Sequence, residues 1–184
     1  MPLQMSVLKK ALYDWVTAVT GKKVIWADQD SPQPTEIDSD DTPYLTLRVT
    51  TMTPVGQDFW SPVNGITGEA KVIGTRRLTL EINHYGADSM DTCEELYKSL
   101  IFPEYQQSLN AVGLTQLNRL PVLNLTGLDD TRYEERARFE ALFLVASESG
   151  GVDVGVIENV EITAKVKKSD GTIIDERVIT VNTP

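Results

Sequence analysis

The sequence predicts an α+β fold: a mostly antiparallel β-sheet with N-terminal and central helices packed on it, a long β-hairpin or arm, and a C-terminal hairpin. Three observations predict it. Residues 5–20 carry apolar side chains at three- and four-residue spacings, as in an amphipathic helix. Residues 44–50 and 77–85 alternate apolar and polar side chains, as in half-buried strands. Asp170-Gly171 separates two more alternating runs, which is typical of a two-residue type I′ hairpin turn.

The N-terminal elements follow from this apolar pattern and from the residues that interrupt it. We expect the first helix to end at Gly21, because glycine readily adopts the left-handed conformation that closes a helix. Residues 24–27 are apolar and too few for a helix, which predicts a short strand. Residues 28–41 contain six acidic residues, two prolines and no basic residue, so they are expected to form an exposed loop.

A segment of about 25 residues, Thr51 to Thr75, separates the strands expected at 44–50 and 77–85. It is rich in glycine and proline, and it is long for a connection inside a compact domain, where such segments are usually functional or disordered. We therefore expect residues 51–75 to form an extended arm or a long hairpin tip.

The second half of the chain predicts two helices and then strands. Asp88 is a candidate N-cap for a helix that begins at Ser89, and a second helix is expected over 104–112. The apolar-rich run 117–125 predicts one strand, placed at a sheet edge or bulge by Pro121. The sequence also predicts a strand over 138–146 and a C-terminal β-hairpin over 157–182.

Composition limits the possible functions. The chain has 184 residues, enough for a single domain over 1–184, and 17 basic against 27 acidic residues give a net charge of −10. Such a surface argues against binding phosphates or anionic lipid. No apolar run reaches the length of a membrane span, and the N-terminus lacks a signal-peptide pattern, so we expect a soluble protein with no membrane partner.

The sequence offers little for catalysis. His84 is the only histidine and Cys93 the only cysteine, and both fall on apolar faces, so structural roles are favoured for them. No glycine-rich phosphate loop and no nucleophile elbow are present. We expect no catalytic residues, no cofactor and no metal site. We therefore expect that the protein is not an enzyme. The enzyme alternative, a small hydrolase with two carboxylates, would need a pair of acids that catalyse turnover.

The arm carries apolar residues that call for an explanation: Val55, Phe59, Trp60, Val63 and Ile66. A loop rich in glycine and proline would leave them in contact with water. Two interpretations stay open, namely that Phe59 and Trp60 fold back onto their own sheet, or that they are buried by a neighbouring subunit or partner, as aromatic residues at interfaces often are.

Three segments resemble the neck terminator (tail terminator) proteins of tailed bacteriophages and prophages. The first is residues 24–34, followed by Pro43-Tyr44-Leu45-Thr46-Leu47; the second is Gly74-Thr75-Arg76-Arg77-Leu78-Thr79-Leu80, leading to Tyr85-Gly86; the third is residues 128–137. The resemblance spans residues 20–165. Gln33 stands where the family pattern has an arginine.

The resemblance implies a structural virion protein, located in the phage neck or tail and assembled in the cytoplasm of the bacterial host. Such proteins form a homo-oligomeric ring, typically a hexamer, that caps the tail tube, terminates tail assembly and joins the tail to the head-completion or connector proteins. The tail sheath is a further partner if the tail is contractile. DNA would pass through an acidic lumen without specific binding.

These expectations give a set of candidate interface residues. The arm contributes the anchors Phe59, Trp60 and Ile66, and the mixed charges of the other motifs indicate subunit contacts or a salt-bridged surface. The charged candidates are Arg76, Arg77, Arg132, Glu134, Glu135 and Arg136. The alternative function is another neck or tail-tube protein of a tailed phage, such as a head-tail connector or tail-completion protein, which would polymerise or bind the portal side instead of capping a tube.

Overall fold

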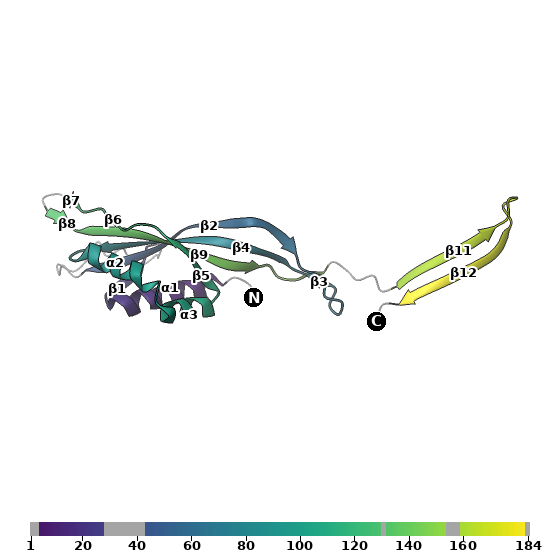
Figure 1. The fold of residues 1–184 in the computed structure, drawn as a ribbon, viewed down its shortest axis with the longest axis horizontal. Helices are drawn as coiled ribbons and strands as arrows, with labels where there is room; N and C mark the ends of the chain where they lie inside the picture. Colours follow the sequence, from purple (N-terminus) through teal and green to yellow (C-terminus); the bar gives the residue numbers. More distant parts are fainter. Residues whose placement is uncertain (1–3, 28–42, 130–131, 154–158, 183–184) are drawn as a thin grey trace. The chain divides into compact units, whose positions relative to one another are not determined.

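The computed structural model describes residues 4–27, 43–129, 132–153 and 159–182, so the acidic loop expected at 28–41 lies almost wholly outside the described residues. The chain forms two compact units (Figure 1). The sheet unit comprises Met1–Phe59 and Val72–Ser149, and the second unit comprises Trp60–Lys71 and Gly150–Pro184. The expectation of one domain over residues 1–184 stays a prediction.

A six-stranded sheet forms the centre of the sheet unit. Its strands lie in the order β1-β2-β4-β9-β5, and β6 also pairs with β9. Their bounds are β1 Lys23–Trp26, β2 Tyr44–Trp60, β4 Val72–Tyr85, β5 Leu114–Arg119, β6 Leu123–Asn124 and β9 Arg136–Glu148. β4 and β9 are antiparallel over their whole length, whereas β1 runs parallel to β2. The predicted α+β class with a mostly antiparallel sheet is confirmed.

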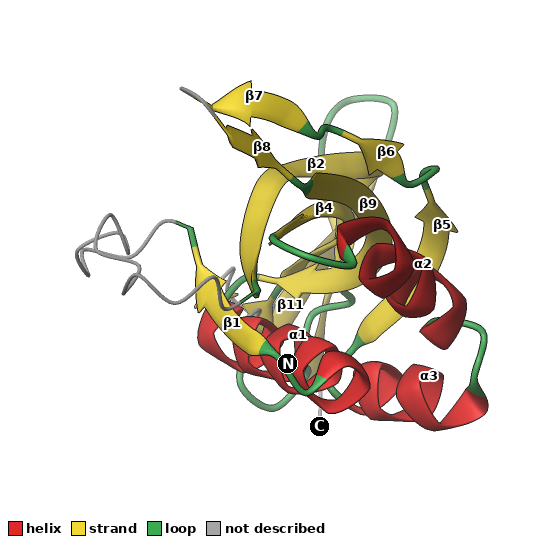
Figure 2. Ribbon diagram, turned by 90° about the vertical axis from the view of Figure 1, so that its left-hand side faces the viewer, coloured by secondary structure: helices red, strands yellow, loops and turns green. Residues whose placement is uncertain are grey.

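Three helices cover one face of this sheet (Figure 2). They are α1 Met5–Thr20, α2 Ser89–Ser99 and α3 Pro103–Ala111. The core lies between the helices and the inward residues of alternating strand positions; its largest fully buried side chains include Leu12, Leu45, Leu78, Leu80, Ile82, Phe139 and Phe143. Gly21 ends α1 in the left-handed conformation with φ 60°, as expected from its lack of a Cβ.

A buried hydrogen bond joins α1 to α2 within this core. Trp15 Nε1 donates to Ser99 Oγ at 3.0 Å, and Ser99 Oγ in turn donates to the Leu96 carbonyl at 2.7 Å. The Trp15 ring also meets Phe143 edge-on, with the ring centroids 6.4 Å apart. The indole therefore adds apolar burial and also satisfies its own polar group, as a buried tryptophan requires.

Two local predictions are wrong, and a third is confirmed only in its position. The single strand expected at 117–125 is two strands, β5 and β6, with Pro121 between them, because proline has no N–H to donate to β9. Asp88 occupies the N-cap position of α2, which begins at Ser89 as predicted, but its side chain makes no capping hydrogen bond; the Asp88 carbonyl accepts from Thr92 instead. The turn at Asp170-Gly171 is not type I′, because only Gly171 has a positive φ there.

The β2 and β4 strands are longer than predicted. β2 continues to Trp60 and β4 begins at Val72, so the segment 51–75 is mostly strand. The turn is confined to the residues between these two strands. Backbone hydrogen bonds from Ser61 N to Lys71 O and from Asn64 N to Glu69 O close that turn. The long-hairpin interpretation of the arm is therefore confirmed as part of the fold.

The remaining elements are paired strands. In the sheet unit, β7 Gly127–Asp129 pairs with β8 Arg132–Glu134. In the second unit, β3 Glu69–Ala70 pairs with β10 Val152–Asp153, and β11 Asn159–Lys167 pairs with β12 Ile173–Asn182 as the predicted C-terminal hairpin. Gly171 N donates to Lys168 O and Lys168 N to Thr172 O, so the turn is closed by a left-handed glycine. Among the described helices, none is long and apolar enough to cross a membrane.

Candidate assembly interface

Apolar side chains remain exposed at the turn between β2 and β4. We call Trp60, Val63 and Ile66 the apolar tip; their exposed fractions are 59%, 47% and 95%. Phe59, on the strand that leads to the tip, is 58% exposed. Phe59 and Trp60 therefore do not fold back onto the sheet as one sequence-based interpretation held. Neighbouring exposed apolar residues of this kind are typical of a surface that another molecule covers.

The apolar tip is an ordered turn. The Asn64 side-chain Oδ1 accepts a hydrogen bond from the backbone N–H of Ile66 at 2.9 Å, and the Gly68 N–H donates to the Asn64 carbonyl at 2.8 Å. Gly68 has φ 69°, a conformation that suits glycine. The turn chemistry of Asn64 and Gly68 thus holds Ile66 outward, so its exposure follows from the backbone structure.

An ion pair joins the two strands of the hairpin below the tip. Arg76 Nη1 and Nη2 donate to Asp58 Oδ1 and Oδ2 at 2.5 and 2.6 Å, and this hydrogen bonding holds the pKa of the Asp58 carboxyl below its usual value. Gly74 leaves room for the Asp58 carboxylate, since a Cβ at position 74 would lie 1.9 Å from Asp58 Oδ1. Arg76 therefore braces its own hairpin, whereas Arg77 is exposed.

The second set of predicted interface residues lies around β8 and the start of β9. Glu134 and Glu135 are exposed, and Glu135 Oε2 accepts from the Asp88 N–H at 3.1 Å. Arg136 lies over the Tyr85 ring at 4.8 Å and donates to Asn83 Oδ1 at 3.1 Å. Glu135 and Arg136 thus contact their own chain, while the Arg132 side chain lies outside the described part of the structure.

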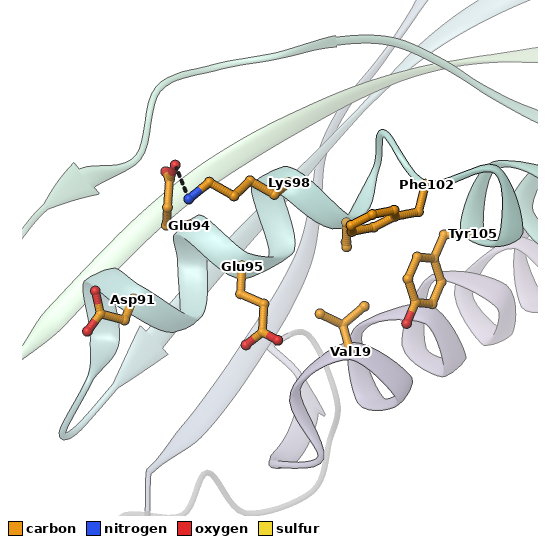
Figure 3. A pocket seen from close by; sticks show the side chains of 8 residues that line it. Val19, Asp91, Glu94, Glu95, Lys98, Phe102 and Tyr105 are labelled. Atoms are coloured by element: carbon orange, nitrogen blue, oxygen red, sulfur yellow. Dashed lines mark ion pairs between the residues drawn. The ribbon is translucent and has the colours of Figure 1, made fainter.

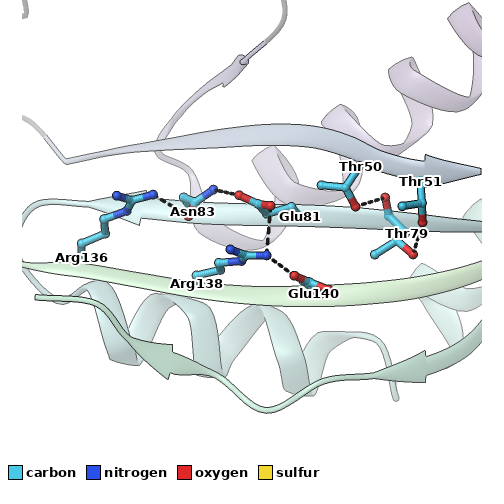
Figure 4. Close-up of polar contacts among 8 residues, drawn as sticks. All are labelled: Thr50, Thr51, Thr79, Glu81, Asn83, Arg136, Arg138 and Glu140. Atoms are coloured by element: carbon cyan, nitrogen blue, oxygen red, sulfur yellow. Dashed lines mark hydrogen bonds and ion pairs between the residues drawn. The ribbon is translucent and has the colours of Figure 1, made fainter.

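A polar network runs along the sheet face opposite the helices (Figure 4). Glu81 of β4 and Glu140 of β9 are directly opposite in the strand register. Arg138 lies between them, with Nη2 3.1 Å from Glu81 Oε2 and in contact with Glu140 Oε1. Asn83 Nδ2 donates to Glu81 Oε1 at 2.8 Å. The alternation over residues 77–85 predicts an outward polar face, but it does not predict this network, which depends on the register between strands.

The described residues form a sheet with helices on one face and paired acidic and basic side chains on the other, and an ordered apolar tip. They contain no catalytic cluster. The family described as phage neck terminator protein matches residues 6–169, which is most of the chain. The chain belongs to the phage neck terminator protein family. No curated protein matches it.

Membership supports a structural role for this neck terminator protein in the phage neck or tail, in association with other neck and tail proteins. The match begins near the start of α1 and ends at residue 169, in the turn between β11 and β12. It therefore covers the whole six-stranded sheet with its helices, the apolar tip and β11, whereas β12 lies beyond it.

The neck terminator also has an open pocket of ≈ 450 Å³ between α1, α2 and α3 (Figure 3). Asp91, Glu94 and Glu95 line one side, and Phe102 and Tyr105 line another. Glu94 is paired with Lys98 at 3.2 Å. Among the described residues no group of three or more histidine, cysteine or acidic side chains could hold a metal ion, so these carboxylates offer no metal site.

His84 and Cys93 are buried in the neck terminator's core, as their positions in the sequence predict. Burial, together with the nearby Lys22, lowers the pKa of His84 to about 4. Lys22 Nζ lies 3.2 Å from His84 Nε2 and donates to Thr92 Oγ1 at 2.7 Å; because an ammonium only donates, Nε2 accepts. Burial also raises the pKa of the Cys93 thiol to about 12. A neutral imidazole and a protonated thiol suit packing roles.

Proposed function

We propose that this neck terminator protein assembles with copies of itself as a ring of six that caps the tail tube and ends tail assembly. The ring then presents a surface to the head-completion proteins of the neck. The observation that carries the proposal is the apolar tip, which the Asn64 turn holds exposed at the end of a braced hairpin. Family membership supplies the setting, in which the partners are other neck and tail proteins.

The energetics favour burial of the tip in an assembly. Transfer of an exposed isoleucine or phenylalanine side chain out of water stabilises by roughly 1.5 to 3 kcal/mol, and Ile66 is 95% exposed. Tryptophan is among the residues that dominate interface energies. Because the turn is already ordered in the single chain, little conformational entropy is lost when the tip docks.

Charged residues provide a second, weaker contact in this proposal. Among the described side chains, the exposed Arg77 and Glu134 remain as charged candidates for contact with a neighbouring subunit. Arg132, whose side chain lies outside the described part of the structure, stays a candidate from the sequence. Arg76, Glu135 and Arg136 instead hold the fold that presents them. Arg132→Glu should therefore weaken ring formation, most at low salt, whereas Lys10→Glu on α1 should have little effect.

The charge of the chain suits a conduit. A net charge of −10 per copy becomes −60 in a ring of six, and a negative lumen would repel passing DNA. We therefore propose that DNA passes the ring without specific binding. We also propose that the protein has no catalytic activity and is located in the virion, after assembly in the bacterial cytoplasm.

The test compares a tip variant with a matched control. Trp60→Ser combined with Ile66→Ser removes the exposed anchors, and Ile101→Ser removes another apolar residue that, like Trp60, is 59% exposed. Six copies of 20.4 kDa give 122 kDa, which sedimentation and negative-stain imaging can detect with purified protein alone or with tail tubes. The control should form rings and stop tube growth, whereas the tip variant should stay folded and do neither.

Two results would contradict the proposal. If the tip variant still forms rings that stop tube growth, the tip is not the assembly contact. If the wild-type protein polymerises on its own or binds only the portal side of the neck, it is a tail-tube or head-tail connector protein, which is the alternative function.

A further inference from the structure

The six-stranded sheet has an open edge on each side. β1 pairs with β2 only over Tyr44–Leu47, so among the described residues β2 has no partner strand on that side from Val49 onward. β5 is the last strand at the opposite side of the sheet, and its outer edge likewise has no partner in the described part of the chain (Figure 2). An edge strand presents unpaired backbone N–H and C=O groups to any strand that can add to it.

The two open edges lie at the same level of the sheet. Thr51 Oγ1 of β2 donates to Thr79 Oγ1 of β4 at 2.9 Å. The register then pairs Thr79 with Leu142 of β9, and Leu142 with Asn118 of β5. One row of residues therefore crosses the whole sheet, from the open part of β2 to β5. Two strands stand between its ends, at a spacing of about 4.8 Å per strand, so the two edges of one copy cannot pair with each other.

Strand direction allows the edges of two copies to pair. β2 and β4 form an antiparallel hairpin, and β4 and β5 are both antiparallel to β9, so β2 and β5 run in opposite directions. In copies placed side by side in one orientation, β2 of one and β5 of the next are thus antiparallel neighbours. Contact between two different edges is heterologous, and edges at one level favour closure into a ring over growth of a filament.

The distribution of charge favours the same two edges. The two longest stretches of the sequence without an acidic residue are 105–128, which contains β5 and β6, and 42–57, which contains the open part of β2. Each stretch contains a single basic residue, Arg119 and Arg48 respectively. In a chain with a net charge of −10, copies repel one another least where acidic residues are missing. The edges are therefore favourable places for contact between copies.

The side chains at the edges also suit such contact. Leu117, at a bulge in β5, is 49% exposed, and Val55 on β2 is 46% exposed. Proteins commonly guard an open edge with lysine or proline. Residues 49–53 contain neither, so this part of β2 is able to pair. Pro54 follows and has no N–H to donate, which ends the stretch that can pair.

We propose that the open edge of β2, residues 49–53, pairs in antiparallel fashion with the outer edge of β5 in the next copy, so that the sheets of neighbouring copies join around the ring. This inference rests on the proposed function, because the edges are joined around that ring. The contact is distinct from the apolar tip: the tip supplies apolar burial, and the edges supply backbone hydrogen bonds. Because the row through Thr51 ends at Asn118, these two residues of adjacent copies are expected to lie close together.

Amide hydrogen exchange of the full-length protein tests whether the edges become paired. In the ring, the amides of residues 49–53 and 114–119 that point to the open side should exchange at least about tenfold more slowly than in the unassembled chain at low concentration. Amides of β4, which has a strand on each side within one copy, are the control and should not change. Slow exchange of all of residues 49–53 in the unassembled chain would mean that the edge is covered within one copy, and would overturn the inference.

Cysteine cross-linking tests which edges meet. Thr51→Cys and Asn118→Cys place thiols at exposed positions on the two edges, and the native Cys93 is buried. With one new cysteine in each chain, a short bismaleimide links only different copies. A mixture of the two variants, assembled into rings, should give a cross-linked dimer. A mixture of Thr51→Cys with Lys10→Cys, an exposed position on α1, is the matched control and should give only background cross-linking.

The remaining outcomes separate this inference from the proposed function. An equally strong dimer from Thr51→Cys alone would mean that β2 edges pair with each other, which overturns the head-to-tail contact. Rings that form without the Thr51–Asn118 cross-link and without slower exchange at the edges would overturn the inference and leave the ring proposal standing. If the wild-type protein forms no ring, alone or with tail tubes, both proposals fail.

Discussion

Replacing Arg138 with glutamine tests whether the polar network on the outer sheet face stabilises the fold. In the wild-type protein the Arg138 guanidinium lies between Glu81 and Glu140, two carboxylates placed directly opposite each other by the β4–β9 register. Like charges at such positions are destabilising. Arg138→Gln removes the intervening positive charge and leaves the two carboxylates facing each other.

The size of the effect follows from burial. Hydrogen bonds to charged groups contribute about 1.5 to 3 kcal/mol when well buried. The side chains of Glu81, Arg138 and Glu140 are 14%, 33% and 23% exposed, so solvent weakens each bond. Two bonds at about 1 kcal/mol each give a loss of about 2 kcal/mol in the free energy of unfolding. For a chain of this length that lowers Tm by about 4 to 8 °C.

Urea and thermal unfolding followed by circular dichroism measure the loss. Arg77→Gln is the matched control, because Arg77 is exposed on the neighbouring strand β4 and its loss should change stability by less than about 0.5 kcal/mol. Glu81→Gln added to Arg138→Gln should recover part of the loss, because it removes one of the two facing carboxylates. A loss below about 0.5 kcal/mol, or no recovery in the double variant, would refute the reasoning.

Three further predictions concern the core and the tip. The pKa of His84 is about 4 in the folded state and about 6.5 in the unfolded state. Between about pH 4 and pH 6.5 the unfolded state therefore binds more protons than the folded state. The free energy of unfolding should therefore fall by about 2 kcal/mol from pH 7.5 to pH 5, measured by urea titration, and an equal fall in His84→Gln would exclude His84 as its cause. Leu12→Ala, at a fully buried position, should cost about 2 to 5 kcal/mol, whereas Ile66→Ala should leave Tm unchanged and weaken ring formation. Cys93 should react with maleimide only as fast as the protein unfolds, and rapid labelling under native conditions would contradict its burial.

The strongest local patterns predicted the fold well. The apolar spacing of residues 5–20 gave α1 with its end at Gly21, and the alternation around residues 77–85 gave the inward face of β4, including His84. The prediction was weaker where hydrogen-bond partners decide the outcome. Pro121 split an expected strand, because its missing N–H matters only once β9 is the neighbour.

The candidate interface could be predicted in composition but not in arrangement. The apolar residues of the arm were recognisable because aromatic side chains are unusual among glycine and proline, but their exposure depends on the Asn64 turn and on strands that continue to the tip. Arg76, Glu135 and Arg136 were candidates for subunit contacts on charge alone, whereas the structure gives each a partner in its own chain.

The sequence by itself determined the fold class, the absence of a familiar catalytic motif, the acidic charge and the resemblance to neck terminator proteins, because these depend on composition, periodicity and short motifs. Only the tertiary structure decided which charged residues brace the sheet and which apolar residues remain exposed. That division depends on strand register: a shift of β4 by one residue would turn Glu81 toward the core, away from Arg138, and would separate Arg76 from Asp58.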